Sequence, residues 1–142
     1  MRTIKFRAWY KEKREMRDVA MLRWENDRLC RIAGYWPGTK DNGWTDFDPA
    51  EGRYQLMQFT GLLDKNGVEI YEGDIIRWDY ERSWWNKAAG SAVFKVEWSD
   101  DRTGWAPFCE CSVTGDYEVS GDVVAVVGNI YENPQLLTTE AR

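Results

Sequence analysis

The chain has 142 residues, a length that fits one domain or two small subdomains sharing a core. Its 43% hydrophobic and 30% charged residues are ordinary for a soluble globular protein, and no apolar run is long enough to span a bilayer. The absence of histidine excludes Ser-His-Asp and Cys-His catalysis within one chain, and the net charge of −5 works against general polyanion binding.

The N-terminal part is predicted to form strands. Apolar and polar side chains alternate from Ile4 to Trp9, and this period of two is typical of a half-buried strand. A second strand is expected over residues 16–24, a hairpin turn at 25–27 and a third strand over 28–33. A helix over residues 12–24 is the competing prediction, because Glu, Met, Leu and Arg favour helices.

Turn dipeptides fill residues 34–53, which predicts a long loop with few regular residues. Three aromatic side chains, Trp36, Trp44 and Phe47, indicate that the loop is not a pure linker. We expect at least one of them to anchor the loop to the core. Loops of this length within compact domains are often functional or mobile.

Turn chemistry is clearest over residues 56–76. A strand is expected at 56–59, followed by a tight turn at Asp64-Lys65-Asn66-Gly67, because Asn and Gly tolerate positive φ. Glu72-Gly73-Asp74 predicts a second turn before a strand over 75–80.

The C-terminal part is predicted to add further short strands over residues 92–98, 108–113 and 117–119. The nearly continuous apolar run at 122–131 predicts a buried strand in a central position of its sheet. Asn133-Pro134 ends that strand, and residues 135–137 are expected to form a short turn or helix.

Short strands separated by turn signals predict a mainly β fold, α+β at most. We expect an N-terminal β-hairpin or meander region with a long loop, residues 1–55, to pack with a C-terminal SH3-like small β-barrel, residues 56–137. Residues 138–142 are expected to be a frayed tail, and the whole chain to be one structural unit. The SH3-like comparison is an analogy of fold and carries no function.

Three cysteines, Cys30, Cys109 and Cys111, are a poor disulfide framework. The first residues have no apolar core of signal-peptide length, so a cytoplasmic location is expected. Cys109 and Cys111 lie on one face of a predicted strand, but tetrahedral zinc needs four ligands and histidine is absent. Free thiols, no metal and no cofactor are therefore expected.

Charge is distributed unevenly along the chain. Residues 1–31 hold ten Lys/Arg and five Asp/Glu, a net +5, and the remaining residues sum to −10. This asymmetry is typical either of a nucleic-acid-facing arm or of a basic element that packs beside an acidic one, and the net acidity favours the second. The candidate phosphate contacts of the first interpretation are Arg7, Lys11, Lys13, Arg14 and Arg17.

Nine tryptophans are the main compositional outlier. Indoles serve in cores, in subunit interfaces or in stacking on bases and sugars. A core of this size does not easily hold nine of them, so some are expected to be partly exposed on an interface or a ligand surface. The candidates for that surface are Trp9, Trp24, Trp84, Trp85 and Trp105.

Glu69, Glu72 and Asp74 form a small acidic cluster. A magnesium-dependent hydrolase would need carboxylates like these. The same residues are explained by turn chemistry, because Gly supplies the backbone freedom and Asp the local hydrogen bonds. The turn interpretation is favoured.

Four sequence blocks together resemble the YopX family of phage and prophage proteins. The resemblance implies a small phage-encoded protein without an assigned biochemical role, β-rich with an SH3-like barrel part, that assembles into homo-oligomers. No catalytic residues follow from it. The blocks are Ile4–Trp9, Leu56–Gly67, Glu69–Ile76 and Val127–Pro134.

The favoured hypothesis is a non-enzymatic accessory protein that self-associates in the cytoplasm of an infected or lysogenic bacterium. Its expected partner is a second copy of itself, with a host or phage protein as a further candidate and no membrane. One alternative is a single-stranded nucleic-acid-binding protein that uses the basic N-terminal strands and tryptophans. The other is a metal-dependent hydrolase that uses the acidic cluster.

Overall fold

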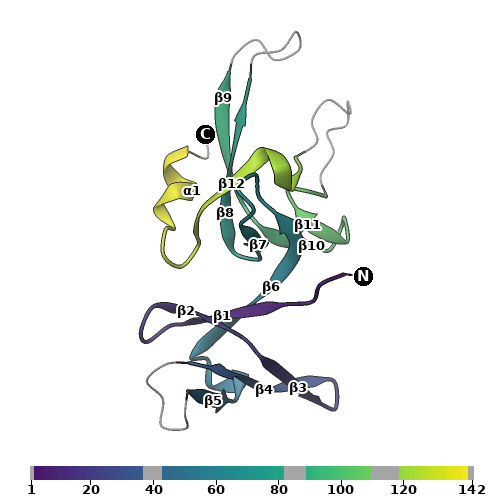
Figure 1. Cartoon of the computed structure of the whole chain (residues 1–142), viewed down its shortest axis with the longest axis vertical. Helices are drawn as coiled ribbons and strands as arrows, with labels where there is room; N and C mark the ends of the chain where they lie inside the picture. The colour runs from purple at the N-terminus through teal and green to yellow at the C-terminus, as the bar shows by residue number, and fades with distance from the viewer. Residues whose placement is uncertain (1, 37–42, 82–88, 110–118, 141–142) are drawn as a thin grey trace. The chain divides into compact units, whose positions relative to one another are not determined.

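The computed structural model describes residues 2–36, 43–81, 89–109 and 119–140, with no side-chain description for 139–140 (Figure 1). Antiparallel strands dominate, which confirms the mainly β fold. The chain divides into two compact units, Met1–Phe59 and Thr60–Arg142, which we call unit 1 and unit 2 and describe separately. The SH3-like barrel and the sequence-based division after residue 55 stay predictions. No helix in the described part is long and apolar enough to cross a membrane.

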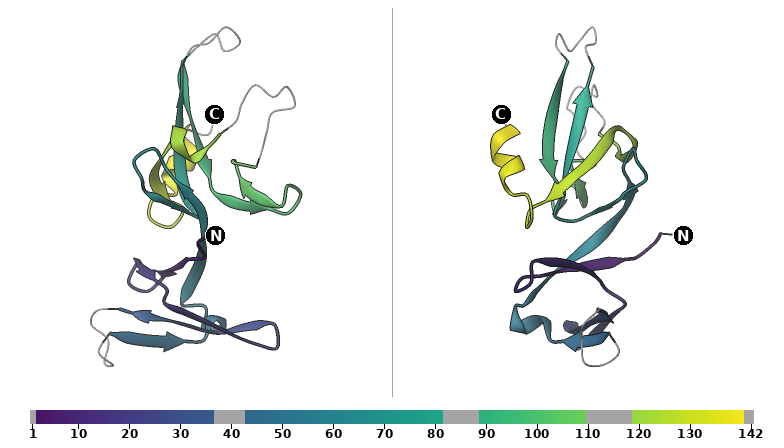
Figure 2. Two further views of the ribbon diagram at one scale, coloured as in Figure 1. Left: turned by 45° about the vertical axis from the view of Figure 1, so that its right-hand side comes forward. Right: turned by 60° about the vertical axis from the view of Figure 1, so that its left-hand side comes forward.

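Unit 1 contains two antiparallel sheets, visible as neighbouring layers in both views of Figure 2. In the first, β1 lies between β2 and β6; in the second, β4 lies between β3 and β5. Buried Ile32, Trp36 and Phe47 form the core, and Tyr54 and Leu56 pack against it. The strands are β1 (Phe6–Tyr10), β2 (Glu15–Asp18), β3 (Met21–Glu25), β4 (Arg28–Tyr35), β5 (Trp44–Phe47) and β6 (Tyr54–Leu63), which continues into unit 2.

The competing helix over residues 12–24 is wrong, and the predicted second strand is in fact two strands, β2 and β3. The chain changes sheets between them. The Val19 amide donates to the Phe6 carbonyl of the first sheet, and the next amide, from Ala20, donates to Ala33 of the second. The predicted hairpin turn is confirmed, since Asn26 and Asp27 both have positive φ, 51° and 62°.

The predicted long loop contains more regular structure than expected. Besides β5 it holds a 3₁₀ turn, Pro49–Glu51, which begins where Asp48 Oδ1 accepts the Ala50 amide at 2.9 Å. The expected anchoring is confirmed, because Trp36 is 2% exposed and its Nε1 donates to the Asp18 carbonyl. Residues 37–42 lie outside the described part.

Unit 2 contains a three-stranded antiparallel sheet in the order β12-β8-β9 and a β10–β11 hairpin, and α1 packs against β9. Its core consists of Ile70, Ile76, Val96, Val119 and Val124. The elements are β7 (Glu69–Tyr71), β8 (Asp74–Tyr80), β9 (Gly90–Lys95), β10 (Glu97–Ser99), β11 (Gly104–Ala106), a 3₁₀ turn (Gly121–Val123), β12 (Val124–Asn129) and α1 (Gln135–Glu140).

The central position predicted for the apolar run at 122–131 is wrong. β8 is the central strand and β12 lies at an edge of this sheet. The pairing register shifts between Val126 and Gly128, and Val127 is 40% exposed. A bulge of this kind interrupts the alternation of the two faces, so a continuous apolar run here does not mean burial on both faces.

Three further strand predictions have different outcomes. The strand over 92–98 is divided at Val96, where β9 ends and β10 follows. Phe108 and Cys109 lie in a turn, whereas 110–118 fall outside the described part. The short turn or helix predicted at 135–137 is a helix, and α1 includes residues 138–140, which the sequence assigned to a tail.

Candidate functional site

The most exposed strand of unit 1 is β3, at one edge of its sheet. Four of its five residues are exposed, whereas β5 at the opposite edge has one exposed residue. Trp24 is 53% exposed and Met21 36%. Within the described part of the chain, β4 is the one strand that pairs with β3. The amide and carbonyl groups of β3 that point away from β4 therefore form an open sheet edge. Such an edge is a template for pairing with another strand.

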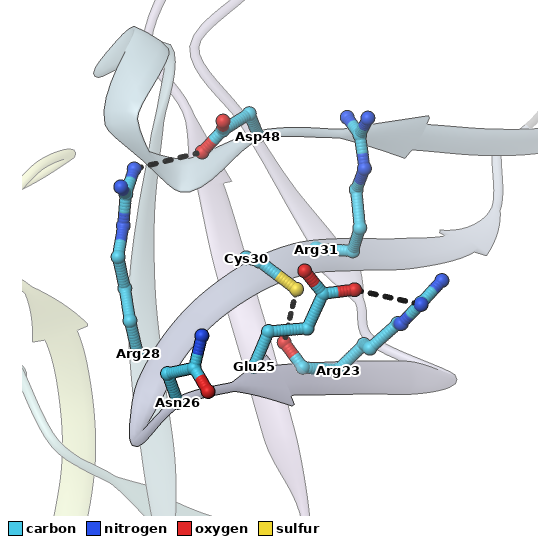
Figure 3. Close-up of a pocket in the computed structure, with 7 residues that line it drawn as sticks. All are labelled: Arg23, Glu25, Asn26, Arg28, Cys30, Arg31 and Asp48. Carbon is cyan, nitrogen blue, oxygen red and sulfur yellow. Dashed lines mark hydrogen bonds and ion pairs between the residues drawn. The ribbon is translucent and has the colours of Figure 1, made fainter.

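A polar hollow of about 520 Å³ lies beside this edge at the tip of the β3–β4 hairpin (Figure 3). Two ion pairs form within it: Arg23 Nη2 lies 2.7 Å from Glu25 Oε1, and Arg28 Nη2 lies 3.9 Å from Asp48 Oδ1. The Cys30 thiol donates to the Arg23 carbonyl at 3.2 Å. Because these arginines face carboxylates, the hollow offers no concentrated positive charge.

The sequence blocks of unit 2 meet in a set of tightly bonded turns around Asp64, which is 5% exposed. Its Oδ1 accepts the Asn66 and Val68 amides at 2.8 and 2.9 Å, and its Oδ2 accepts the Val126 amide at 2.9 Å. Burial, the largest single influence, raises the pKa of Asp64, but the amide donors and the Lys65 ammonium outweigh it and the pKa lies below its ordinary value. This carboxylate joins the turn at residues 64–68 to β12.

Backbone and side-chain hydrogen bonds also hold the other sequence blocks of unit 2 in place. The Gly73 amide donates to the Val96 carbonyl at 2.8 Å, and the Gly73 carbonyl accepts the Ile130 amide at 2.9 Å. Asn129 Oδ1 accepts the amides of Tyr131 and Glu132 at 3.0 and 2.9 Å. Residues far apart in sequence therefore form one scaffold.

Comparison with known proteins gives a family and one related structure. Residues 5–138 match the family described as YopX protein. The chain belongs to the YopX family. It is also similar to the crystal structure of protein EF1440 from Enterococcus faecalis, with 31% identity, coverage of 96% of this chain and 99% of that one, and a TM-score of 0.62. No curated protein matches the chain.

Two members of the acidic cluster, Asp74 and Glu69, make local hydrogen bonds within the fold. Asp74 is 1% exposed and its Oδ2 accepts the Tyr71 amide at 2.8 Å. Glu69 Oε2 accepts the Tyr71 hydroxyl at 2.8 Å. Within the described residues, which include Glu72, no three His, Cys, Asp or Glu side chains gather closely enough to hold a metal ion.

The five predicted phosphate contacts of this member of the YopX family do not share one exposed face. Arg17 stands opposite Ala8 of β1, so these two side chains share one face of the first sheet. Arg7 is the neighbour of Ala8 on β1 and stands opposite Met57, so it points to the other face. Trp9, interleaved with them in sequence, is 3% exposed, and the Arg14 guanidinium lies 5.8 Å from its ring. The remaining two, Lys11 and Lys13, are exposed in the β1–β2 turn.

The predicted tryptophan surface draws on residues of both units. Trp24 is exposed on β3, whereas Trp105 is half-buried on β11 and makes an edge-to-face contact with Trp98, with ring centroids 5.2 Å apart. Trp98 is 46% exposed and was missed, although its place at the end of a predicted strand could have indicated exposure. Trp84 and Trp85 lie outside the described residues, as does Cys111. Cys30 and Cys109 are free thiols, as predicted.

Proposed function

We propose that this YopX-family protein is a phage-encoded, non-enzymatic interaction module that self-associates through strand β3 in the bacterial cytoplasm. The observation that carries the proposal is the open edge of β3 with Trp24 half exposed upon it. Tryptophan is enriched at the centres of protein interfaces. The phage origin is supported by the resemblance of the sequence blocks to this family.

The sequence of β3 is complementary to a second copy of itself. In an antiparallel pairing centred on Trp24, each Arg23 stands opposite the Glu25 of the other copy, and the two Trp24 side chains stand opposite each other. Aromatic pairs and opposite charges are the cross-strand pairs that stabilise antiparallel sheets. A twofold arrangement uses this one surface twice, as closed dimers do.

Light scattering after size exclusion tests the proposal. We expect a particle larger than one chain at micromolar concentration, and Trp24→Ser should shift it toward the monomer. Trp98→Ser is the matched control, because Trp98 is exposed to a similar degree but lies on β10. A wild-type monomer at every concentration, or equal effects of the two variants, would contradict the proposal.

Charge reversal tests the register. Arg23→Glu and Glu25→Arg should each weaken association, because each places like charges opposite one another. The double variant restores opposite charges in both cross-strand pairs and should recover the larger particle. Failure of the double variant to recover would reject pairing centred on Trp24.

A further inference from the structure

Arg17 is a buried cation whose position the fold fixes unusually well. Its side chain is 8% exposed, and its Cζ lies 5.1 Å from the Tyr10 ring and 5.4 Å from the Trp36 ring. Its Nη2 donates to Glu15 Oε2 at 2.7 Å. A guanidinium carries five N–H donors, and Glu15 is its one acceptor among the described residues. Donors therefore remain for another acceptor.

Arg17 lines a cavity of about 370 Å³ within unit 1. Lys13 and Arg53 line it too, from the β1–β2 turn and the segment before β6. Lys13 makes no ion pair with a described residue, and Arg53 Nε lies 3.3 Å from Glu51 Oε2. The cavity's other carboxylate, Asp46, lies 3.6 Å from Arg31 outside it. Positive charge thus exceeds negative charge at the cavity wall.

Two hydroxyl groups add to this set of donors. Thr45 Oγ1 is fully buried and has no hydrogen-bond partner in the described structure. Tyr54 lines the same cavity, and burial raises the pKa of its phenol, so the hydroxyl keeps its proton at neutral pH. A buried hydroxyl without a partner destabilises the fold, and an acceptor within its reach would offset that loss.

We infer that this cavity binds a small phosphate-type oxyanion, held by the Arg17 guanidinium and by the charges of Lys13 and Arg53. A planar guanidinium fork matches two oxygens of one anion, and the contacts of Arg17 with two aromatic rings lower the entropy cost of ordering it. A doubly charged phosphate group uses several donors at once, more than a single carboxylate does.

The cavity does not offer a stacking site on Tyr54. That ring is stacked between Tyr10, with centroids 4.5 Å apart, and Phe47, with centroids 3.7 Å apart. A nucleic-acid base would need one of those faces. The Tyr54 ring therefore offers a base no free face, and the inference concerns the phosphate group alone.

Isothermal titration of the full chain with inorganic phosphate, phosphoserine and acetate at low salt tests the inference. Phosphate and the monoester should bind, and acetate should bind at least tenfold more weakly. Arg17→Lys keeps the charge and removes the fork, so it should weaken phosphate binding at least tenfold. No binding of phosphate by the wild-type chain, or acetate binding equal to phosphate, would overturn the inference.

Lys13→Ala keeps the test decisive if Arg17 variants fail to fold, because Lys13 is exposed in a turn. It should weaken phosphate binding severalfold. Lys11→Ala, two residues away, exposed and outside the cavity, is its matched control and should bind as the wild type does. Equal effects of the two lysine variants would show general charge attraction and reject the site. Trp24→Ser should bind phosphate normally, which separates this test from that of self-association.

Discussion

Buried charge is hydrogen-bonded differently in the turns of unit 2 and in the cavity of unit 1. The buried carboxylates of Asp64 and Asp74 are engaged by backbone amides of their own unit. The buried guanidinium of Arg17 lies close to two aromatic rings and has donors left over. A carboxylate whose oxygens accept amide protons is committed to the fold, whereas a cation with spare donors can bind a further acceptor. The acidic family blocks thus build scaffold, whereas the site inferred to bind an anion lies in unit 1.

The distribution of charge follows the same division. Residues 1–59 hold twelve Lys/Arg and nine Asp/Glu, a net +3, and residues 60–142 hold seven and fifteen, a net −8. The asymmetry seen in the sequence is therefore a difference between two compact units. Opposite signs on two units steer association with partners of either charge.

Replacing Asp64 with alanine should have the largest effect on stability. Three backbone amides lose their acceptor in a site that is 5% exposed. We expect a loss of about 3 kcal/mol in the free energy of unfolding, measured by urea denaturation. Asp101→Ala, in the exposed β10–β11 turn, should change it by less than about 0.5 kcal/mol. Equal losses for both variants would remove the structural role given to Asp64.

Gly34→Ala tests the packing of unit 1 and should have the next largest effect. A Cβ at this position would lie 2.6 Å from the Asp18 carbonyl oxygen and 2.8 Å from Trp36 Nε1. Those two atoms form the hydrogen bond that anchors Trp36. Overpacking of this kind costs about 2 kcal/mol, again measurable in urea.

The double variant Gly34→Ala/Trp36→Phe distinguishes this mechanism from a general loss of stability. Both single changes disrupt the bond between Trp36 and Asp18, so their losses should not add. Full additivity, or a Gly34→Ala protein as stable as the wild type, would show that the close approach is not a constraint.

The features that sequence predicts well are local. The turns at Asn26-Asp27 and around Gly67 follow from residues that tolerate positive φ, and both are confirmed by φ values of 51°, 62° and 79°. What decides the rest is pairing over long separations. The change of sheets at Val19-Ala20 and the edge position of β12 depend on partners that alternation along one strand does not specify.

The candidate site was even less predictable. Arginine is rarely buried, so a sequence places Arg17 on the surface among its basic neighbours. Its burial requires Trp36, nineteen positions further along the chain, to lie over it. Likewise, the amide of Val126 that binds Asp64 comes from a residue 62 positions away. The residue types were informative, but only the tertiary contacts distinguish the carboxylates that bind backbone amides from the guanidinium that has unused donors.

Acid titration gives the smallest expected effect and the most direct measure of how far Asp64 is committed to the fold. The pKa of Asp64 is lowered in the folded state, because burial, which raises it, is outweighed by three amide donors and Lys65. In the unfolded chain an Asp titrates at about pH 3.9. The contribution of Asp64 to the free energy of unfolding is thus present in full above that pH, and it is lost as pH falls toward the lower pKa of the folded state.

Asp64→Asn keeps the shape of the side chain but has no proton to gain. The difference in free energy of unfolding between wild type and Asp64→Asn, from urea midpoints, should therefore be largest at about pH 6 and narrow by about pH 3. The other carboxylates are common to both proteins and cancel in that difference. A difference independent of pH would mean that the amides bind the protonated and charged forms of Asp64 equally, and the contrast with Arg17 would then rest on geometry alone.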